Sequence, residues 1–299
     1  MNKKKIIVIC GPTASGKTSL GIQIANLING EIISADSMQI YKDMDVGSAK
    51  PTAEERAQAV HHLVDFVEPN KRYSVADFKK DAENKIKEIL FKNKVPIIVG
   101  GTGLYVNSLI YNIHYNEIET DLEYRKALEK NTIQELYEMA EKTDHDALMK
   151  ISPTDRKRIS RILEIYHSTG RTKTELEKES RHEPEYDYKV FVLNMDRQKL
   201  YDRINLRVDL MIKAGLVDEV KQMLEKYNEF PTSMQGLGYK EIVDYLKGKC
   251  SLDEASEKIK IETRRYAKRQ LTWFRSYSNA TWIESGNSDN IDVILNSLK

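Results

Sequence analysis

The sequence predicts an α/β fold: a P-loop kinase-like parallel sheet flanked by helices, with an all-helical insertion domain and a helical C-terminal part. Short apolar runs alternate with longer amphipathic segments over the first hundred residues, which is the pattern of βα units. A glycine-rich phosphate-binding motif follows the first apolar run. The strand pattern then stops near residue 112 and returns in one apolar run after residue 187.

The elements of the first part follow from hydrophobic periodicity. Four apolar runs predict strands, the third more weakly than the others: 6–10, 31–35, 62–67 and 96–99. Two amphipathic segments between them predict helices: 18–28 and 74–91. Such alternation places the strands side by side in a parallel sheet, with helices packed on its faces.

The second part of the chain has a different pattern. Residues 112–187 consist of charged helical stretches without a convincing strand, and an apolar run at 189–195 predicts one more. We therefore expect a helical insertion domain at 112–187 and a core built from 1–111 and 188–299. The segments that follow the last strand are predicted to be helical: 197–214, 217–227, 239–246 and 252–277.

Composition excludes several classes of protein. The chain has 299 residues, 40% of them hydrophobic and 31% charged, which argues against disordered and fibrous proteins. Its two cysteines, Cys10 and Cys250, are too few for a disulfide framework and lack zinc-ligand spacing. This cysteine usage suits the reducing cytoplasm, where we expect the protein. No apolar stretch approaches 18 residues, so we expect no membrane insertion.

The strongest local signal is a phosphate-binding loop between the first strand and the first helix. Its eight residues fit the pattern G-x-x-x-x-G-K-[ST]: Gly11, Pro12, Thr13, Ala14, Ser15, Gly16, Lys17 and Thr18. Backbone N–H groups and the helix N-terminus favour an anion, Lys17 reaches the outer phosphates, and Thr18 offers its hydroxyl to Mg²⁺. The motif indicates a polyphosphate or a diphosphate without choosing between them, and a turn that merely caps the helix is the alternative.

Two more candidate positions lie at the carboxyl ends of predicted strands. Asp36 follows the second strand, at the edge where ligands bind in α/β sheets, and its carboxylate suits a Mg²⁺ ligand, a general base or a helix cap. After the run at 96–99 come Gly100, Gly101 and Thr102, which allow close approach of a ligand or simply form a tight turn. No strand there ends in Asp, which disfavours an ordinary ATPase and favours a bound diphosphate.

The net charge of +1 conceals a separation of charges along the chain. Residues 113–147 carry ten acidic and four basic side chains, whereas 155–161 carry four basic and one acidic, and 264–275 carry five basic and none acidic. Basic runs with interleaved aromatic residues favour a nucleic-acid partner. The alternative is a pair of solvated helix faces in which Trp273 and Phe274 belong to the core.

These motifs together resemble the bacterial tRNA dimethylallyltransferase (tRNA isopentenyltransferase) family. The segments that carry the resemblance follow one another along nearly the whole chain: GPTASGKT at 11–18, ISADSMQIYKDMDVGSAKP at 33–51, HHLVDFVEP at 61–69, YSVADF at 73–78, PIIVGGTGLY at 96–105, RKRISRILEIYHSTG at 156–170, RINLRVDLMIKAGLVDEV at 203–220, QGLGYKEI at 235–242 and TRRYAKRQLTWFR at 263–275. Most of these segments are weak signals alone, but their joint order is specific.

The resemblance implies transfer of a dimethylallyl group from dimethylallyl diphosphate to N6 of the adenosine 3′-adjacent to the anticodon (position 37) of tRNAs, releasing diphosphate. It implies the tRNA anticodon stem-loop as a partner, with the insertion domain contacting the anticodon arm, and we expect Mg²⁺ as cofactor and a monomer. The alternatives are a P-loop small-molecule kinase, a free-adenylate prenyltransferase and a non-catalytic RNA-binding protein. The basic segments are expected to line one groove, with the acidic face turned away.

The same resemblance assigns roles to individual residues. Asp36 corresponds to the general base, Thr102 lies beside the reacting centre, and Arg207, better aligned than Arg203, stabilises the diphosphate together with the P-loop residues 11–18. The tRNA contacts carried over are Asp36, Ser37, Met38, Gln39, Thr102, Arg125, Lys157, Arg158, Ile159, Ser160, Arg161, Gln235, Gly236, Gly238, Tyr239, Lys240 and Arg269.

Overall fold

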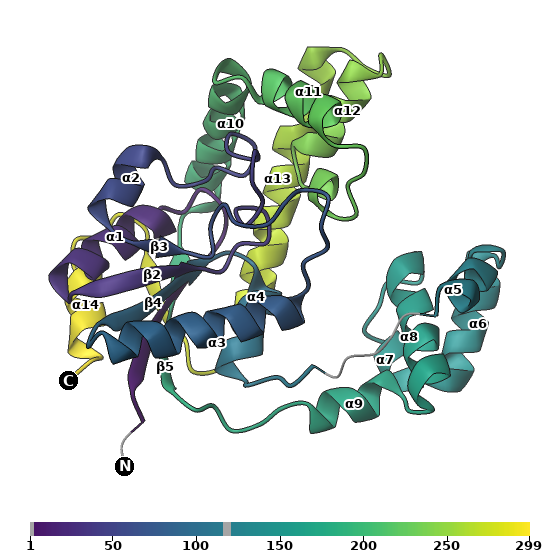
Figure 1. The fold of residues 1–299 in the computed structure, drawn as a ribbon, viewed down its shortest axis with the longest axis horizontal. Coiled ribbons are helices and arrows are strands. Elements are labelled where there is room, and N and C mark those ends of the chain that lie inside the picture. The colour runs from purple at the N-terminus through teal and green to yellow at the C-terminus, as the bar shows by residue number, and fades with distance from the viewer. Residues whose placement is uncertain (1–2, 116–120) are drawn as a thin grey trace. The chain divides into compact units, whose positions relative to one another are not determined.

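The structure is a computed structural model that describes residues 3–115 and 121–299 (Figure 1). It divides into two compact units, the first made of Met1–Ile110 and Glu185–Lys299 and the second of Tyr111–Pro184. The insertion expected at 112–187 overlaps the second unit. Two acidic residues of the stretch 113–147, Glu117 and Glu119, lie outside the described residues. Within the described ranges, no helix is long and apolar enough to cross a membrane.

A six-stranded sheet forms the centre of the first unit, and every neighbouring pair of its strands is parallel. In chain order the strands are β1 (Lys5–Cys10), β2 (Gly30–Ser34), β3 (His61–His62), β4 (Val95–Gly100), β5 (Asp187–Asn194) and β6 (Thr281–Glu284). Their spatial order is β3-β2-β4-β1-β5-β6. Strand β1 therefore lies between β4 and β5, and its fully buried Ile9 pairs with Val99 on one side and Phe191 on the other.

Helices cover the sheet and extend beyond its carboxyl edge (Figure 1). The α-helices of this unit are α1 (Lys17–Leu27), α2 (Ala53–Gln58), α3 (Val75–Phe91), α4 (Gly103–Ile110), α10 (Arg197–Lys213), α11 (Leu216–Lys226), α12 (Tyr239–Leu246), α13 (Leu252–Phe274) and α14 (Asn290–Asn296), with a short 3-10 turn at Ser233–Gln235. Capping boxes start several of them, such as Ser74 with Asp77 at α3 and Ser251 with Glu254 at α13. Each box satisfies backbone N–H groups that a helix start leaves unpaired.

Two hydrophobic cores of the first unit bear on the position of the site. One joins the sheet to α1 through residues such as Ile7, Ile24 and Ile32. The other packs α10 to α13 around the segment that follows β2, where Tyr41 and Met44 are almost completely buried. The loop after β2 is therefore held by helices from the far end of the chain.

The second unit is helical, with α5 (Leu122–Glu129), α6 (Ile133–Thr143), α7 (His145–Leu148), α8 (Arg156–Thr169) and α9 (Lys173–Glu179). The apolar sides of α5 to α8 form their own small core. Asp144 joins α9 to this core, because its carboxylate accepts hydrogen bonds from the backbone N–H and the hydroxyl of Thr174 at 2.8 and 2.7 Å. The helical character expected of this segment is confirmed.

The sequence predicted the sheet well except at two places. The strand expected at 62–67 is wrong beyond His62, because Leu63 and Asp65 adopt left-handed backbone conformations with φ of 58° and 62°. The Asp65 N–H instead donates to the Gln39 carbonyl at 2.9 Å. Strand β6 was not predicted, since only one of its four residues, Ile283, is buried and the apolar signal is short.

Candidate active site

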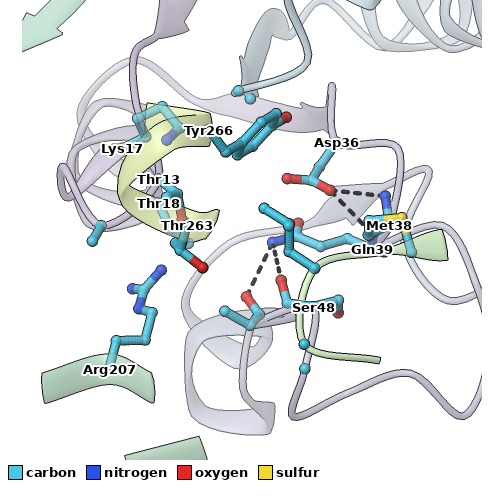
Figure 2. A pocket seen from close by; sticks show the side chains of 18 of the residues that line it. Thr13, Lys17, Thr18, Asp36, Met38, Gln39, Ser48, Arg207, Thr263 and Tyr266 are labelled. Atoms are coloured by element: carbon cyan, nitrogen blue, oxygen red, sulfur yellow. Dashed lines mark hydrogen bonds between the residues drawn. The ribbon is translucent and has the colours of Figure 1, made fainter. Parts of the chain in front are cut away.

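A cavity of about 600 Å³ lies in the first unit at the carboxyl edge of the sheet (Figure 2). Its wall comes from the P-loop, the segments that follow β2, helices α10 and α13, and the segment before α12. Eighteen of the residues singled out from the sequence line it: Thr13, Ala14, Gly16, Lys17, Thr18, Asp36, Ser37, Met38, Gln39, Gly100, Gly101, Arg203, Arg207, Gln235, Gly236, Gly238, Lys240 and Arg269. The cavity thus joins the phosphate motif to the candidate base and to both arginines.

The P-loop has a fixed shape. Gly16 has φ of 91°, a conformation that favours glycine, and it starts helix α1. Lys17 Nζ donates to the Pro12 carbonyl at 2.6 Å, so the side chain folds back over the loop. The Thr13 N–H donates to Gln270 Oε1 at 2.9 Å. The hydroxyl of Ser15 is buried and has no hydrogen-bond partner among the described residues, which leaves a polar group inside the loop for a bound anion.

The electrostatics of this region suit an anionic ligand. Burial lowers the pKa of Lys17 to about 8, with Arg207 acting in the same direction and Asp36 against it. Burial and the neighbouring Arg203 also lower the pKa of Arg207, which nevertheless stays charged. A β-carbon added to Gly16 would lie 3.8 Å from an Arg203 Nη, so this guanidinium reaches the P-loop. Several cations are therefore gathered around one loop, an arrangement that a diphosphate would neutralise.

Asp36 uses one carboxylate oxygen locally, and the other has no hydrogen-bond partner among the residues that the structure describes. Oδ1 accepts the N–H groups of Met38 at 2.9 Å and Gln39 at 3.3 Å, which fixes the turn after β2. Figure 2 shows the carboxylate facing the cavity, opposite the ring of Tyr266. A Mg²⁺ ligand, a general base and a helix cap were the alternatives at the level of sequence. Residues 37–40 form a turn and not a helix, so Oδ1 holds a turn, and the cap is not seen.

Thr102 does not line the cavity but supports a residue that does. Its Oγ1 accepts the Ser37 N–H at 3.0 Å and donates to Ser37 Oγ at 3.3 Å. The nearby hydroxyl of Tyr266 stays protonated, because burial and Asp36 raise its pKa to about 12 although hydrogen bonding to Thr102 and Gln270 acts against this. The neutral hydroxyl of Tyr266 therefore lies near enough to Asp36 for the carboxylate to affect its pKa.

Four other expected residues are likewise not among those that line the cavity: Gly11, Pro12, Ser15 and Tyr239. A β-carbon at Gly11 would lie 2.8 Å from the Leu193 carbonyl, so this glycine lets the loop pack against β5. Tyr239 is 1% exposed, and its ring fills the space beside Gly47. Gly11 and Tyr239 therefore have packing roles.

The tRNA contacts expected in the second unit differ in their surroundings. Arg125 binds the carboxylate of Glu164 through two hydrogen bonds of 2.7 and 2.8 Å, and Arg161 binds it at 3.1 Å. Burial acts to raise the pKa of Glu164, but the two arginines outweigh it and hold the pKa below its usual value. The two guanidinium groups are therefore oriented by one shared carboxylate.

The other expected tRNA contacts on α8 differ in exposure. Lys157 and Arg158 are exposed, and Ser160 is partly buried. Ile159 is completely buried in the helical core, so neither its side chain nor its backbone is accessible to tRNA in this structure. Arg156, from the same basic run, is used structurally, since one Nη donates to the carbonyls of Leu128, Glu129 and Asn131.

No cluster of three or more His, Cys, Asp or Glu side chains able to hold a metal occurs in the described part of the chain. The donors around the P-loop are instead hydroxyl groups, of which Thr18 lines the cavity. Mg²⁺ commonly keeps several waters and takes most of its remaining ligands from substrate phosphates. The donor set therefore fits a magnesium ion that arrives with a diphosphate.

Sequence reasoning missed part of the wall that α13 supplies. Thr263, Tyr266 and Gln270 line the cavity. The Gln270 side chain also joins two loops, since Nε2 donates to the Gly101 carbonyl at 2.8 Å while Oε1 accepts from Thr13. Spacing by three and four places these residues on one face of a helix, and this periodicity could have identified them. The basic residues between them drew attention instead.

Comparisons with known proteins agree over nearly the whole chain. Residues 39–277 match the family described as IPP transferase, and residues 4–64 match the one described as isopentenyl transferase. A tRNA dimethylallyltransferase of Acetivibrio thermocellus is 49% identical over 300 residues, covering 98% of this chain and 96% of that protein. One of Thermoanaerobacter sp. is 53% identical over 286 residues, covering 93% and 91%.

Solved structures give the same result. A tRNA isopentenylpyrophosphate transferase from Bacillus halodurans is 42% identical, with a TM-score of 0.74 and coverage of 99% of this chain and 96% of that one. A eukaryotic dimethylallyltransferase acting on tRNA is 32% identical, with a TM-score of 0.82 and coverage of 98% and 77%. The predicted fold class is confirmed by these likenesses and by the parallel sheet.

Proposed function

This chain belongs to the IPP transferase family, and on that premise we propose that it transfers a dimethylallyl group from dimethylallyl diphosphate to tRNA. The acceptor is N6 of the adenosine 3′-adjacent to the anticodon (position 37), and diphosphate is released. The observation that carries this proposal is one cavity in which a cationic P-loop, with Lys17, shares its wall with the carboxylate of Asp36.

The donor is proposed to bind through its diphosphate at the P-loop. Lys17 exchanges its bond to the Pro12 carbonyl for phosphate oxygens, and Arg203 and Arg207 approach from α10. These cations offset the charge that builds up on diphosphate as the carbon–oxygen bond breaks. The two arginines share this task, with Arg203 closer to Gly16 and Arg207 more deeply buried.

Magnesium is proposed to be held by the Thr18 hydroxyl and by diphosphate oxygens. When bound, it would supply further positive charge to the leaving group. We expect Thr18→Val to raise the Mg²⁺ concentration needed for half-maximal transfer, and Thr18→Ser, which keeps the hydroxyl, to restore it. A magnesium titration of initial rates measures this, and an unchanged requirement in Thr18→Val would exclude Thr18 as a ligand.

Asp36 is proposed as the general base. The adenine amine is a weak nucleophile, and loss of its proton to the free oxygen of Asp36 assists attack on the first carbon of the dimethylallyl group. One nitrogen–carbon bond forms, the carbon–oxygen bond breaks, and the bonding electrons leave with diphosphate. Ser37, Met38 and Gln39 follow Asp36 in the wall and are proposed to hold the target nucleotide.

The adenosine has to leave the stack of the anticodon loop to enter the cavity. Extruding a base from a single-stranded loop costs only a few kcal/mol, and contacts to the RNA backbone can offset this. Lys157 and Arg158 on α8 and Arg269 on α13 are exposed and suited to such contacts. We also propose that the working unit is a cytoplasmic monomer, because a single chain supplies every wall of the cavity.

The deciding experiment incubates the purified protein with dimethylallyl diphosphate, Mg²⁺ and unmodified tRNA, followed by nucleoside analysis of the tRNA. We expect N6-dimethylallyladenosine at position 37, and its absence would overturn the proposal. Parallel reactions separate the alternatives. Prenylation of free adenylate would indicate the small-molecule prenyltransferase, and phosphoryl transfer from ATP without prenyl donor would indicate a kinase.

A further inference from the structure

The loop at 43–49 forms part of the cavity wall, yet it belongs to no helix or strand. Three successive backbone N–H groups in this loop point to one carboxylate. Glu219 on α11 accepts the N–H of Asp45 at 2.8 Å and of Val46 at 2.7 Å through Oε2, and that of Gly47 at 3.1 Å through Oε1. Hydrogen bonds from N–H groups to an ionised carboxylate are stronger than neutral ones, so Glu219 clamps this loop.

The clamp is itself held in place. The hydroxyl of Tyr239 on α12 donates to Glu219 Oε1 at 2.7 Å. The Tyr239 ring is buried and packs so tightly against Gly47 that an added β-carbon there would lie 2.5 Å from it. Glu219 therefore has little freedom to turn away from the loop.

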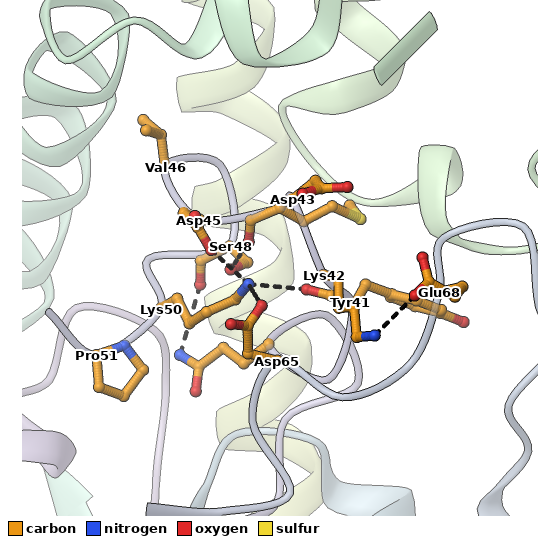
Figure 3. Close-up of polar contacts among 12 residues, drawn as sticks. Tyr41, Lys42, Asp43, Asp45, Val46, Ser48, Lys50, Pro51, Asp65 and Glu68 are labelled. Carbon is orange, nitrogen blue, oxygen red and sulfur yellow. Dashed lines mark hydrogen bonds and ion pairs between the residues drawn. The ribbon is translucent and has the colours of Figure 1, made fainter. Parts of the chain in front are cut away.

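A second group fixes the loop from inside (Figure 3). The side chain of Lys50 is 2% exposed, and its Nζ donates to the Tyr41 carbonyl at 2.8 Å and pairs with Asp65 at 2.7 Å and with Asp45. Burial of this cation is compensated by two carboxylates and a carbonyl. Lys50 thus gives the loop its internal shape, whereas Glu219 sets its position against α11.

The position of the loop controls a residue in the wall. Gln39 Nε2 donates to the Ala49 carbonyl at 3.0 Å and to the Ser48 carbonyl at 3.5 Å. Its Oε1 accepts the Ser34 hydroxyl at 3.1 Å. The Gln39 amide is therefore stretched between the end of β2 and the loop, and displacement of the loop would move the amide.

We propose that Glu219 is a positioning residue for the nucleotide substrate, acting through the loop at 43–49 and Gln39. This inference rests on the proposed function, in which Gln39 contacts the target nucleotide. The P-loop is held by other groups, since Thr13 is bonded to Gln270 and the Ser15 carbonyl accepts the Ser285 hydroxyl at 2.5 Å. The effect should therefore fall on the tRNA side of the reaction and leave the diphosphate side unchanged.

The test is Glu219→Gln, which keeps the size of the side chain but removes its charge and turns an amide NH₂ toward backbone N–H groups. We expect kcat/KM for tRNA to fall about 10- to 100-fold, as for a substrate misplaced by about 1 Å, while the KM for dimethylallyl diphosphate stays within twofold. Glu225→Gln, on the exposed side of the same helix, is the matched control and should retain wild-type values.

Two further measurements separate positioning from a general loss of structure. Hydrogen exchange at the amides of 45–47 should accelerate in Glu219→Gln, with exchange in the strands of the sheet unchanged. In a double-mutant cycle, Gln39→Ala should remove most of the effect of Glu219→Gln, because both act on one contact.

Each outcome is decisive. Wild-type kinetics for tRNA in Glu219→Gln, or equal losses for both substrates with a lowered melting temperature, would overturn the proposal while leaving the prenyltransferase function intact. A wild-type protein without transfer activity would instead overturn the proposed function. The exchange rates at 45–47 would still report whether Glu219 clamps the loop.

Discussion

Asp36 shows how one side chain can serve structure and chemistry together. Its Oδ1 holds the turn at Met38 and Gln39. An asparagine could accept the same two N–H groups through its amide oxygen, but it could not take up a proton. The turn and the proposed base can therefore be separated by a single substitution.

We expect Asp36→Asn to lower kcat about 10²- to 10⁴-fold while the dissociation constant for tRNA stays within twofold. Single-turnover transfer of labelled dimethylallyl groups measures the first quantity, and a filter-binding assay measures the second. Asp253→Asn, at an exposed position of α13 away from the cavity wall, is the control. Transfer at the wild-type rate by Asp36→Asn would remove Asp36 from the role of base.

Titration of Lys17 should make catalytic efficiency and the free energy of unfolding change with pH in opposite directions. Its pKa is lowered to about 8 in the folded protein, chiefly by burial, from a usual value of 10.5. The charge that binds diphosphate is present below pH 8 and lost above it, so kcat/KM for dimethylallyl diphosphate should fall as pH rises through about 8. Lys17→Arg, which stays charged, should remove this fall, and an unchanged pH profile in that variant would assign it to another group.

The free energy of unfolding should instead increase as the pH rises above about 8. Between pH 8 and 10.5 the unfolded chain keeps the Lys17 proton that the folded protein has lost, so the free energy of unfolding gains a contribution that rises with pH. Denaturant titrations of wild type and Lys17→Met across this range measure the contribution as a difference. An identical pH dependence in the two proteins would contradict the lowered pKa.

At the level of elements, helix α8 combines structural and exposed cations in one basic run. Arg156 and Arg161 are bonded to protein groups, whereas Lys157 and Arg158 are exposed, although Arg158 also pairs with Asp155 at 3.3 Å. The sequence pattern predicted a basic RNA-binding helix but could not separate these roles. Arg156 binds carbonyls of the segment 128–131, and Arg161 binds the carboxylate of Glu164. Tertiary packing brings these partners together, so the local sequence pattern does not show them.

We expect Lys157→Glu combined with Arg158→Glu to weaken tRNA binding and to lower the slope of log K against log salt by about 0.7–0.9 for each phosphate that the variant no longer binds. Prenyl-donor binding should not change. Lys178→Glu, an exposed reversal on α9 in the same unit, is the control. Equal slopes for the wild type and the double variant would show that α8 does not contact the RNA.

Helix α13 shows why its sequence supported two interpretations. Phe274 is completely buried, as the structural alternative expected, and Trp273 is 39% exposed, packs against Gly103 and donates from Nε1 to Asn107 at 3.2 Å. The same helix turns Gln270 and Tyr266 toward the cavity. The helix itself could be predicted from periodicity, but its division among core, cavity and solvent depends on which elements pack around it.

In the whole molecule, local motifs predicted the P-loop and Asp36, because strand ends and glycine spacing fix their place on a parallel sheet. The Glu219 clamp could not be predicted, since it joins residues about 170 positions apart through a loop without periodicity.

The proposal that the basic segments line one groove stays a prediction. Each unit has its own core.

The two ligands should therefore protect different parts of the chain. Because the cavity is lined entirely by the first unit, inorganic diphosphate with Mg²⁺ should slow hydrogen exchange at 11–18 and leave α8 unchanged. Unmodified tRNA should slow exchange in both units. Protection of α8 by diphosphate alone would contradict this assignment of ligands to units.

The central place of β1 has a consequence for synthesis on the ribosome. Its partner β5 follows the residues 111–184, which take roughly 4–15 s to translate at about 5–20 residues per second. Throughout that interval β1 has no partner on the side where β5 will pair. Its apolar edge is then exposed and can pair with strands of other chains. The insertion at 111–184 therefore lengthens the period in which this edge of the nascent chain is unpaired.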